Sequence, residues 1–293
     1  MEKKKVKREF WIALINIMQD VWLRSLLRRQ LFGSFLKKIL WFRGHALKDI
    51  NLSKQLMQHQ AELESDGVTV MPIISQELLR RVIEHCSSAT LVNPWRREEG
   101  AFKLSSRPSS TKTAHLLEPL KCPGVSELVY DENTLKIMAG IFKSKFVIDS
   151  VDIWWSFPTN EDAQEAENYH RDTDSTEFYK HFIYITDVGF DNGPTTIIPG
   201  SHLTKDFYSS KRFSDDEVES LYAGKKVMTG AAGTNFIANT LGLHKGQQPK
   251  SGVRLLMQFR FSLHGSSFRY RGSKHPFHAP WVSKYIYKDY LVE

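Results

Sequence analysis

The chain has few of the features that mark specialised structural classes. It contains only two cysteines, Cys86 and Cys122, and no CxxC pair, which argues against a disulfide framework. We expect two reduced, buried thiols in a reducing compartment. The sequence also shows no internal repeat and no low-complexity tract. These absences argue against a repeat protein or a biased, disordered chain.

Long hydrophobic runs are missing as well. In the N-terminal segment the longest uncharged run is residues 10–19, which is too short to span a bilayer. No small-residue cleavage site follows it, so we expect no cleaved secretory signal. With 41% hydrophobic and 12% aromatic residues among 293, the chain can still build a packed core. These values predict one large globular domain with appendages.

Net positive charge is missing outside the N-terminus. Residues 1–45 hold eleven Lys or Arg and three acidic side chains, an excess of +8, whereas the whole chain carries +7. The body of the protein is therefore nearly neutral. A nucleic-acid enzyme would need a basic groove across its body. We therefore expect no nucleic-acid partner and a cytoplasmic location.

The basic N-terminal segment also has apolar residues at helical spacing, beginning with Trp11, Leu14, Met18 and Trp22. Such a helix could lie on an anionic membrane surface. It could equally pack its apolar side on the main domain and leave its charges in water. A mitochondrial transit peptide is a third, weaker interpretation, because the segment is not rich in serine. We expect a basic amphipathic helical extension over residues 1–50, with peripheral membrane contact through residues 1–45 as one open alternative.

The remaining chain divides into a helical part and a strand-rich part. Helices are predicted over 51–66, 75–86 and 126–142, a strand over 68–72, a polar loop over 97–115 and an acidic helical insert over 207–222. Short β-branched and aromatic runs, separated by turn residues, predict strands over 146–157, 182–188, 195–198, 234–238 and 253–263. We therefore expect one domain over residues 51–293. Its parts would be helical support (51–145), a β-roll core (146–265) and a C-terminal tail (266–293).

Two histidines and one aspartate form the candidate metal site. His170 and Asp172 are alternate residues, so they point to one face if the local chain is extended. His244 follows the predicted strand 234–238 and could supply a third ligand. Two imidazoles and one carboxylate leave three coordination positions open, an arrangement suited to non-haem iron(II) and dioxygen.

A basic residue near this set suggests an acidic co-substrate. Arg254 begins the strand that follows His244 and could point into the same cavity. A guanidinium binds a carboxylate bidentately, which suits one end of a dicarboxylate. Ser156, at the end of another predicted strand, is a second candidate contact for the co-substrate.

The sequence resembles the phytanoyl-CoA dioxygenase-like branch of the iron(II)/2-oxoglutarate oxygenases from about Glu62 to Leu263. Four motifs in the same order carry the resemblance. They are ESDGVTVMP at 64–72, HRD at 170–172, NGPTTIIPGSH at 192–202, and GLHKG at 242–246 followed by the Arg254 strand. The resemblance implies a double-stranded β-helix, or jelly roll, with flanking helices.

The resemblance also implies chemistry. His170, Asp172 and His244 would bind iron(II), and Arg254 would bind the distal carboxylate of 2-oxoglutarate. With dioxygen, the enzyme would convert 2-oxoglutarate to succinate and hydroxylate a small-molecule or lipid-like substrate. The family's substrate-contacting loops have no readable match here, so an acyl-CoA substrate does not carry over. An acidic residue at position 172 favours hydroxylation over halogenation.

Several other residues have simpler interpretations. We expect His202, in the PGSH motif, to fix a turn by hydrogen bonding, and Asp174 to be solvated rather than to support a metal ligand. Trp154 and Trp155 should face opposite sides of their strand, one toward the core and one toward a pocket. The alternative function is a non-catalytic membrane-surface or ligand-binding protein on the same fold.

Overall fold

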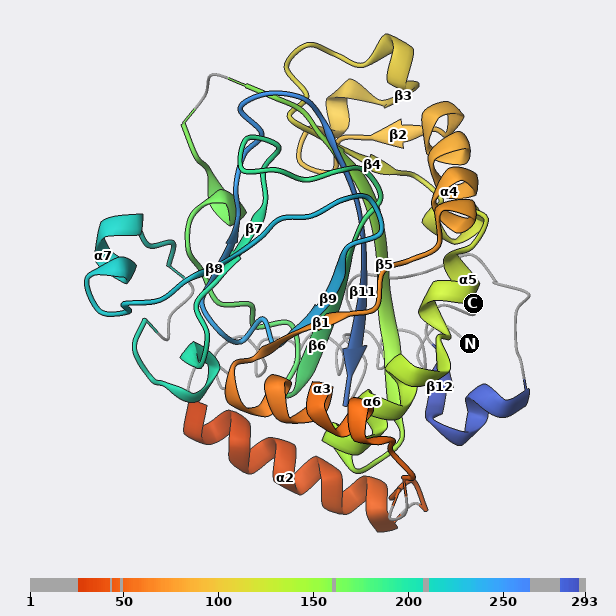
Figure 1. The fold of residues 1–293 in the computed structure, drawn as a ribbon, viewed down its shortest axis with the longest axis vertical. Coiled ribbons are helices and arrows are strands. Elements are labelled where there is room, and N and C mark those ends of the chain that lie inside the picture. The colour runs from red at the N-terminus through yellow and green to blue at the C-terminus, as the bar shows by residue number, and fades with distance from the viewer. Residues whose placement is uncertain are drawn as a thin grey trace, which may run out of the picture.

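The computed structural model describes residues 26–42, 44–47, 50–159, 162–207, 211–263 and 280–289. Within these ranges, a large β-sheet faces a small one, and helices cover the outer face of the large sheet (Figure 1). The first half of the predicted helical extension, including Trp11, Leu14, Met18 and Trp22, lies outside the described residues. No helix among the described ranges combines the length and apolar character needed to cross a membrane.

The large sheet is almost entirely antiparallel. Nine strands belong to it among the described residues, and eight of them form a continuous order. That order is β1 (Val68–Met71), β9 (Asn235–Ala238), β6 (Phe178–Tyr184), β11 (Arg254–Ser262), β5 (Phe146–Ser156), β4 (Thr113–Leu116), β2 (Leu91–Val92) and β3 (Ala101–Phe102). The ninth, β12 (Ile286–Asp289), pairs in parallel with the start of β5. Part of the predicted C-terminal tail is therefore a strand of the sheet.

The small sheet lies across from the inner face of the large one. In the described chain it has three antiparallel strands, in the order β10 (His244–Gly246), β7 (Thr195–Ile197) and β8 (Lys226–Met228). The predicted fold class, a mainly β jelly roll with flanking helices, is confirmed. His244 begins one of these short strands, which places a candidate ligand between the two sheets.

The described helices are α2 (Leu26–Phe42), α3 (Lys54–Ser65), α4 (Gln76–Ser88), α5 (Val125–Val129), α6 (Glu132–Phe142) and α7 (Asp215–Glu219). Among them, α3, α4, α6 and α7 begin at a capping side chain. Ser75 caps α4 as predicted, because its side chain accepts from the backbone N–H of Leu78. The single helix predicted over 126–142 is divided, because Asp131 acts as the N-cap of α6 and accepts from the N–H of Thr134 at 2.8 Å. Short 3₁₀ turns complete the chain: η1 (Arg97–Glu99), η2 (Leu104–Ser106), η3 (Pro119–Lys121), η4 (Glu165–Glu167), η5 (Ser201–Leu203) and η6 (Pro280–Lys284).

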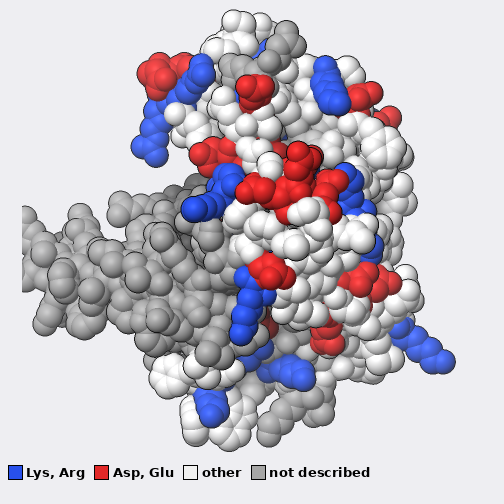
Figure 2. All heavy atoms as spheres, turned by 90° about the vertical axis from the view of Figure 1, so that its left-hand side faces the viewer, with Lys and Arg blue, Asp and Glu red and all other residues white. Residues whose placement is uncertain are grey.

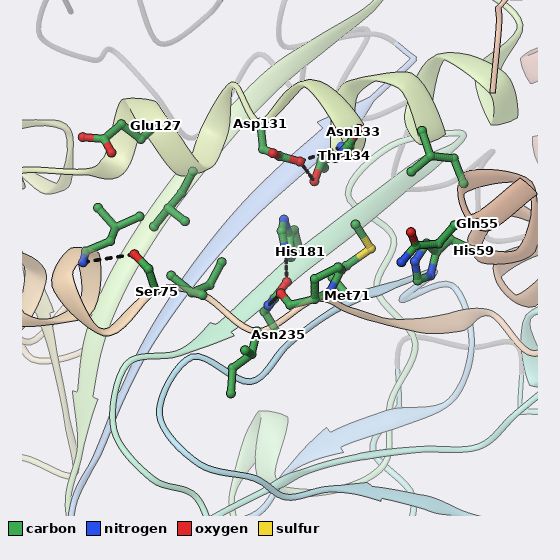
Figure 3. A pocket seen from close by; sticks show the side chains of 16 residues that line it. Gln55, His59, Met71, Ser75, Glu127, Asp131, Asn133, Thr134, His181 and Asn235 are labelled. Atoms are coloured by element: carbon green, nitrogen blue, oxygen red, sulfur yellow. Dashed lines mark hydrogen bonds between the residues drawn. The ribbon is translucent and has the colours of Figure 1, made fainter. Parts of the chain in front are cut away.

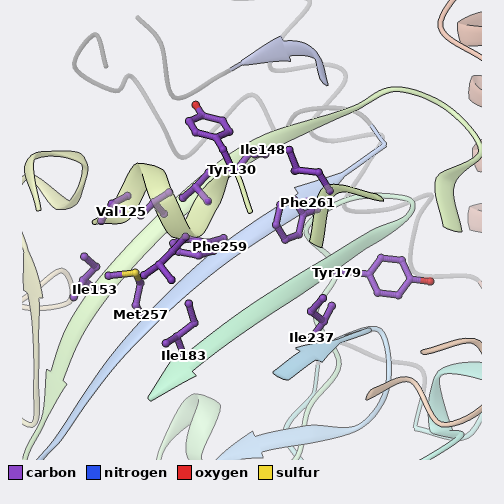
Figure 4. Packing of buried hydrophobic residues seen from close by; sticks show 14 of the residues in the cluster. Val125, Tyr130, Ile148, Ile153, Tyr179, Ile183, Ile237, Met257, Phe259 and Phe261 are labelled. Carbon is purple, nitrogen blue, oxygen red and sulfur yellow. The ribbon is translucent and has the colours of Figure 1, made fainter. Parts of the chain in front are cut away.

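The main hydrophobic core fills the space between the large sheet and the helices. Strand alternation sends Met257, Phe259 and Phe261 of β11 toward α5 and α6, where all three are completely buried (Figure 4). Burying each such side chain stabilises the fold by about 1.5–3 kcal/mol. The intervening residues of β11 face the other way, into the space between the sheets. The helical layer thus holds one face of the sheet and leaves the other free to line a cavity.

Three local predictions were wrong. The polar segment 97–115 is not a plain loop, because it contributes the edge strand β3 and most of β4, which lies between β5 and β2. In β4, partly exposed residues alternate with buried ones. The strand predicted over 182–188 is β6, and it begins four residues earlier, at Phe178. In the described part of the insert predicted over 207–222, only α7 is an α-helix.

Candidate functional site

The two candidate histidines are paired directly through their backbones. The N–H of His170 donates to the carbonyl of His244 at 3.0 Å, and the N–H of His244 donates back at 3.1 Å. Residues paired in this way carry their side chains on the same side of the ladder. The two imidazole centroids lie 4.3 Å apart. Residues far apart in the sequence are thus brought together by an isolated β-bridge.

Each imidazole is held in one tautomer by a backbone carbonyl. Nδ1 of His170 lies 2.9 Å from the carbonyl of Asn168, and Nδ1 of His244 lies 3.0 Å from the carbonyl of Gly242. A carbonyl only accepts, so both Nδ1 atoms carry a proton, which leaves Nε2 of each ring as the nitrogen available to a metal. Burial, followed by the neighbouring His244, lowers the pKa of His170 to about 3. His170 is therefore a neutral donor near pH 7.

Asp172 completes the group. Its backbone N–H donates to the carbonyl of Thr240 at 2.9 Å, and its carboxylate lies 3.6 Å from Nε2 of His170 and 3.3 Å from Nε2 of His244. One donor atom from each of the three residues lies within 4.8 Å of the other two, and this is the one such group of three or more among the described residues. The donor set and tautomers fit a divalent first-row metal, although the role of these residues as ligands stays a prediction.

A buried lysine that the sequence did not reveal contacts this carboxylate. Nζ of Lys180, on β6, lies 2.6 Å from Oδ2 of Asp172 and 3.1 Å from Asp174. Burial alone would raise the pKa of Asp172, but Lys180 and His244 hold it well below the usual range of an aspartate. The only sequence signal was a lysine beside apolar residues, just before the point where the strand was predicted to start.

Arg254 and Ser156 are neighbours at the far end of the same strands. They are direct partners in the β5–β11 register, and Nη2 of Arg254 donates to Oγ of Ser156 at 3.1 Å. Nη1 donates to the carbonyl of Gly193. Burial lowers the pKa of Arg254, and in the described chain its buried Nε has no hydrogen-bond partner and its guanidinium no carboxylate partner. A buried cation of this kind fits an anionic ligand.

Gly193 shapes the turn that receives this guanidinium. Its φ is +79°, and a Cβ at this position would lie 2.5 Å from the carbonyl oxygen of Gln247 and 2.9 Å from the ring nitrogen of Pro249. Only glycine meets both conditions without strain. The turn can therefore approach the segment after β10 closely and close this end of the site.

A cavity of about 650 Å³ joins these groups. His170, Asp172, His244, Arg254 and Ser156 all line it, together with apolar and polar side chains of β4, β5, β6 and β11. The volume lies within the range of small-molecule sites. Trp154 forms part of its wall and stacks on His115 with centroids 5.3 Å apart, whereas Trp155 is buried in the core. The predicted split of the two tryptophans is confirmed.

Other residues considered from the sequence have different roles. Nε2 of His202 donates to the carbonyl of Glu64 at 3.2 Å and so ties its turn to α3. The prediction that Asp174 is solvated was wrong, because it pairs with Lys180 and with Arg260. Both cysteines are buried free thiols, as expected. Three further histidines of the sequence, His264, His275 and His278, lie outside the described residues.

A second cavity of about 400 Å³ lies behind the large sheet, between α3, α4 and α6 (Figure 3). His181 lines it and is hydrogen-bonded to Asn235 at 2.8 Å. Because His181 follows Lys180 in β6, strand alternation turns its ring away from the candidate metal site. His181 therefore does not belong to the ligand group.

The face that carries α7 has charges of both signs (Figure 2). The acidic side chains of this region include Asp215, Asp216 and Glu217 in the first turn of α7. Two lysines neutralise part of this charge: Lys245 lies 2.5 Å from Asp215, and Lys225 lies 2.7 Å from Glu219. This face thus presents mixed charge beside the site, not a field of one sign.

Comparison with known proteins agrees with this geometry. The chain is similar in fold to the non-haem α-ketoglutarate-dependent carbocyclase SnoK of nogalamycin biosynthesis (17% identity, TM-score 0.51, 72% of this chain and 84% of SnoK covered). It is similar to EctD from S. alaskensis with bound Fe (14%, 0.52, 74% and 82%). It is also similar to HygX from Streptomyces hygroscopicus with nickel, 2-oxoglutarate and hygromycin B bound (13%, 0.50, 76% and 91%). At such identities these likenesses show the fold alone.

Sequence comparison is more specific. No curated protein matches the chain significantly. The model of the family described as phytanoyl-CoA dioxygenase (PhyH), in contrast, matches residues 79–252, which is more than half of the chain. The matched region contains the candidate ligands and ends just before Arg254. The chain belongs to the phytanoyl-CoA dioxygenase family.

Proposed function

We propose that this protein is an iron(II)- and 2-oxoglutarate-dependent oxygenase that hydroxylates a small-molecule or lipid-like substrate. The observation that carries the proposal is the convergence of two imidazole nitrogens and a carboxylate on one cavity wall, with a buried guanidinium in the same cavity. Two structures of similar fold hold iron, or nickel with 2-oxoglutarate. The cofactors predicted from the sequence, iron(II), 2-oxoglutarate and dioxygen, agree with the family and the donor set.

In this proposal each residue has a defined task. His170, Asp172 and His244 hold the metal, and the backbone carbonyls on Nδ1 keep both rings in the donating tautomer. Arg254, supported by Ser156, binds the distal carboxylate of 2-oxoglutarate. The bound iron supplies oxygen activation coupled to the decarboxylation of 2-oxoglutarate to succinate. The protein contributes the orientation of the bound groups within the cavity.

The cavity wall indicates what kind of substrate fits. Trp154, Phe182 and Leu256 supply apolar surface, and Asp152 and Gln258 supply polar groups from adjacent strands. These side chains favour a molecule with an apolar body and a few hydrogen-bonding groups. The fold alone does not give the type of reaction, because SnoK, which has a similar fold, is a carbocyclase. Hydroxylation is therefore part of the proposal.

Succinate production tests the proposal. Purified protein supplied with iron(II), 2-oxoglutarate and dioxygen should form succinate slowly without substrate, and faster with an accepted one. Asp172→Asn and His244→Ala should abolish both rates, whereas His202→Asn, outside the ligand group, should retain them. If the protein binds 2-oxoglutarate but forms no succinate with any of a broad substrate panel, the non-catalytic alternative holds instead.

A second proposal concerns helix α2 and is carried by its outer surface. Leu31, Phe35 and Phe42 are 64%, 57% and 79% exposed and lie on one side of the helix. On the other side Leu40 is buried, and Lys37 pairs with Glu177 of the body at 2.7 Å. An exposed apolar stripe within the +8 segment fits an anionic lipid surface. We propose peripheral contact with such a surface, without insertion across it.

A further inference from the structure

A row of alternating charges runs from the proposed metal ligand into the sheet. Lys180 lies between Asp172 and Asp174, at 2.6 and 3.1 Å. Arg260 continues the row, with Nη1 2.9 Å from Asp174 and Nε 2.7 Å from Asp149. The side chains of Arg260 and Asp149 are each 1% exposed, and that of Lys180 is 10% exposed. The row is therefore an internal part of the fold and not a surface network.

The sheet fixes the position of this row. Lys180 on β6 and Arg260 on β11 are direct cross-strand partners, and Asp149 belongs to the adjacent strand β5. Asp172 and Asp174, in contrast, belong to the irregular segment that precedes β6. The backbone of Asp172 is held by its hydrogen bond to Thr240, and its carboxylate is tied to the rigid sheet through Lys180. Burial makes such ion pairs costly to break.

We infer that Lys180 is the positioning residue of the metal site and limits Asp172 to a single coordinating oxygen. The inference rests on the proposed function. Lys180 donates to Oδ2 at 2.6 Å, and this oxygen also lies 3.3 Å from Nε2 of His244. Oδ1, 3.6 Å from Nε2 of His170, is the carboxylate oxygen that the lysine leaves free. A carboxylate that offers one oxygen takes one coordination position, so three positions stay open for 2-oxoglutarate and dioxygen. Without Lys180 both oxygens can bind the metal, and the second takes a position that 2-oxoglutarate needs.

Two binding constants test this inference without turnover. Cobalt(II) is titrated into the metal-free full-length protein, and 2-oxoglutarate is then titrated into the cobalt-loaded protein under nitrogen. We expect Lys180→Met to bind cobalt(II) no more weakly than the wild type does, because a positive charge near the metal site is removed. We expect 2-oxoglutarate to bind at least roughly tenfold more weakly, as for other residues that support metal ligands. Lys180→Arg should restore its affinity, since it keeps the charge and donors.

A matched control is Lys245→Met. Lys245 is also a buried lysine and is adjacent to His244, but it pairs with Asp215 on α7, so both constants should equal those of the wild type. If Lys180→Met does not fold, the charge-neutral double variant Lys180→Met/Asp174→Asn should show the same split between the two constants.

The remaining outcomes overturn the inference. Unchanged 2-oxoglutarate affinity in cobalt-loaded Lys180→Met shows that the lysine does not restrict the carboxylate. If Lys180→Met binds both cobalt(II) and 2-oxoglutarate more weakly and also has a lower thermal stability, the role of Lys180 is purely structural. A wild-type protein that binds no cobalt(II) refutes the proposed function itself, and the inference with it.

Discussion

Replacing Arg254 with methionine should selectively remove the affinity for the distal carboxylate of 2-oxoglutarate. The guanidinium is buried, has no carboxylate partner among the described residues, and keeps Nε free of hydrogen bonds. A hydrogen bond to a charged group contributes about 1.5–3 kcal/mol. Two such bonds to one carboxylate make about 4 kcal/mol a reasonable loss, which corresponds to roughly 1000-fold weaker binding.

The assay compares two 2-oxo acids on the metal-loaded protein. 2-Oxopentanoate has the same chain as 2-oxoglutarate but lacks the distal carboxylate, so Arg254→Met should leave its affinity nearly unchanged. Quenching of Trp154, which lines the cavity, can report both titrations. The ligand-free variant should be at least as stable as the wild type, because a buried and unpaired cation is removed. Equal losses for the two acids, or none for either, would refute the assigned role of Arg254.

Three further predictions concern other parts of the molecule. Burial lowers the pKa of His181 below its ordinary value of 6.5. Below about pH 6.5 the unfolded chain therefore binds a proton that the folded chain does not, and the free energy of unfolding should decrease by up to ~1.4 kcal/mol per pH unit. His181→Gln should reduce that slope in urea titrations of the metal-free protein, and an unchanged slope would count against the argument. The hydrogen bond with Cys122, and then burial, raise the pKa of Cys86. Iodoacetamide should therefore label Cys86 at least roughly tenfold more slowly in the native protein than in urea. Equal labelling rates would contradict this. Phe35→Glu/Phe42→Glu should weaken flotation with phosphatidylserine vesicles, and flotation equal to that of the wild type would exclude the proposed lipid contact.

The sequence predicted the parts of the site that local patterns encode. The HRD motif, the turn before β7 and the GLHKG segment each contain a readable signal, and their order was enough to predict which three side chains would converge. Strand alternation separated Trp154 from Trp155 correctly. The motifs and the strand alternation depend on neighbours in the chain, which a single sequence displays directly. The β-bridge that joins His170 to His244 does not, and only the order of the motifs pointed to it.

The ion-pair row could not be predicted in the same way. Lys180 and Arg260 are cross-strand partners 80 residues apart, and Arg260 meets Asp149 across 111 residues. In the sequence a lysine beside apolar residues resembles a strand end, so β6 was predicted to start too late. Strands β3 and β4 were missed for a related reason, since their pairing with β2 is visible only once the sheet is assembled.

Locating the metal itself tests the central claim most directly. Crystals of the protein loaded with manganese(II) and 2-oxoglutarate under nitrogen would show the ion by its anomalous scattering. We predict one peak at about 2.2 Å from Nε2 of His170, from Nε2 of His244 and from a single oxygen of Asp172, with the distal carboxylate of 2-oxoglutarate on Arg254. A peak bound elsewhere, or the three side chains turned away from a common centre, would contradict the account.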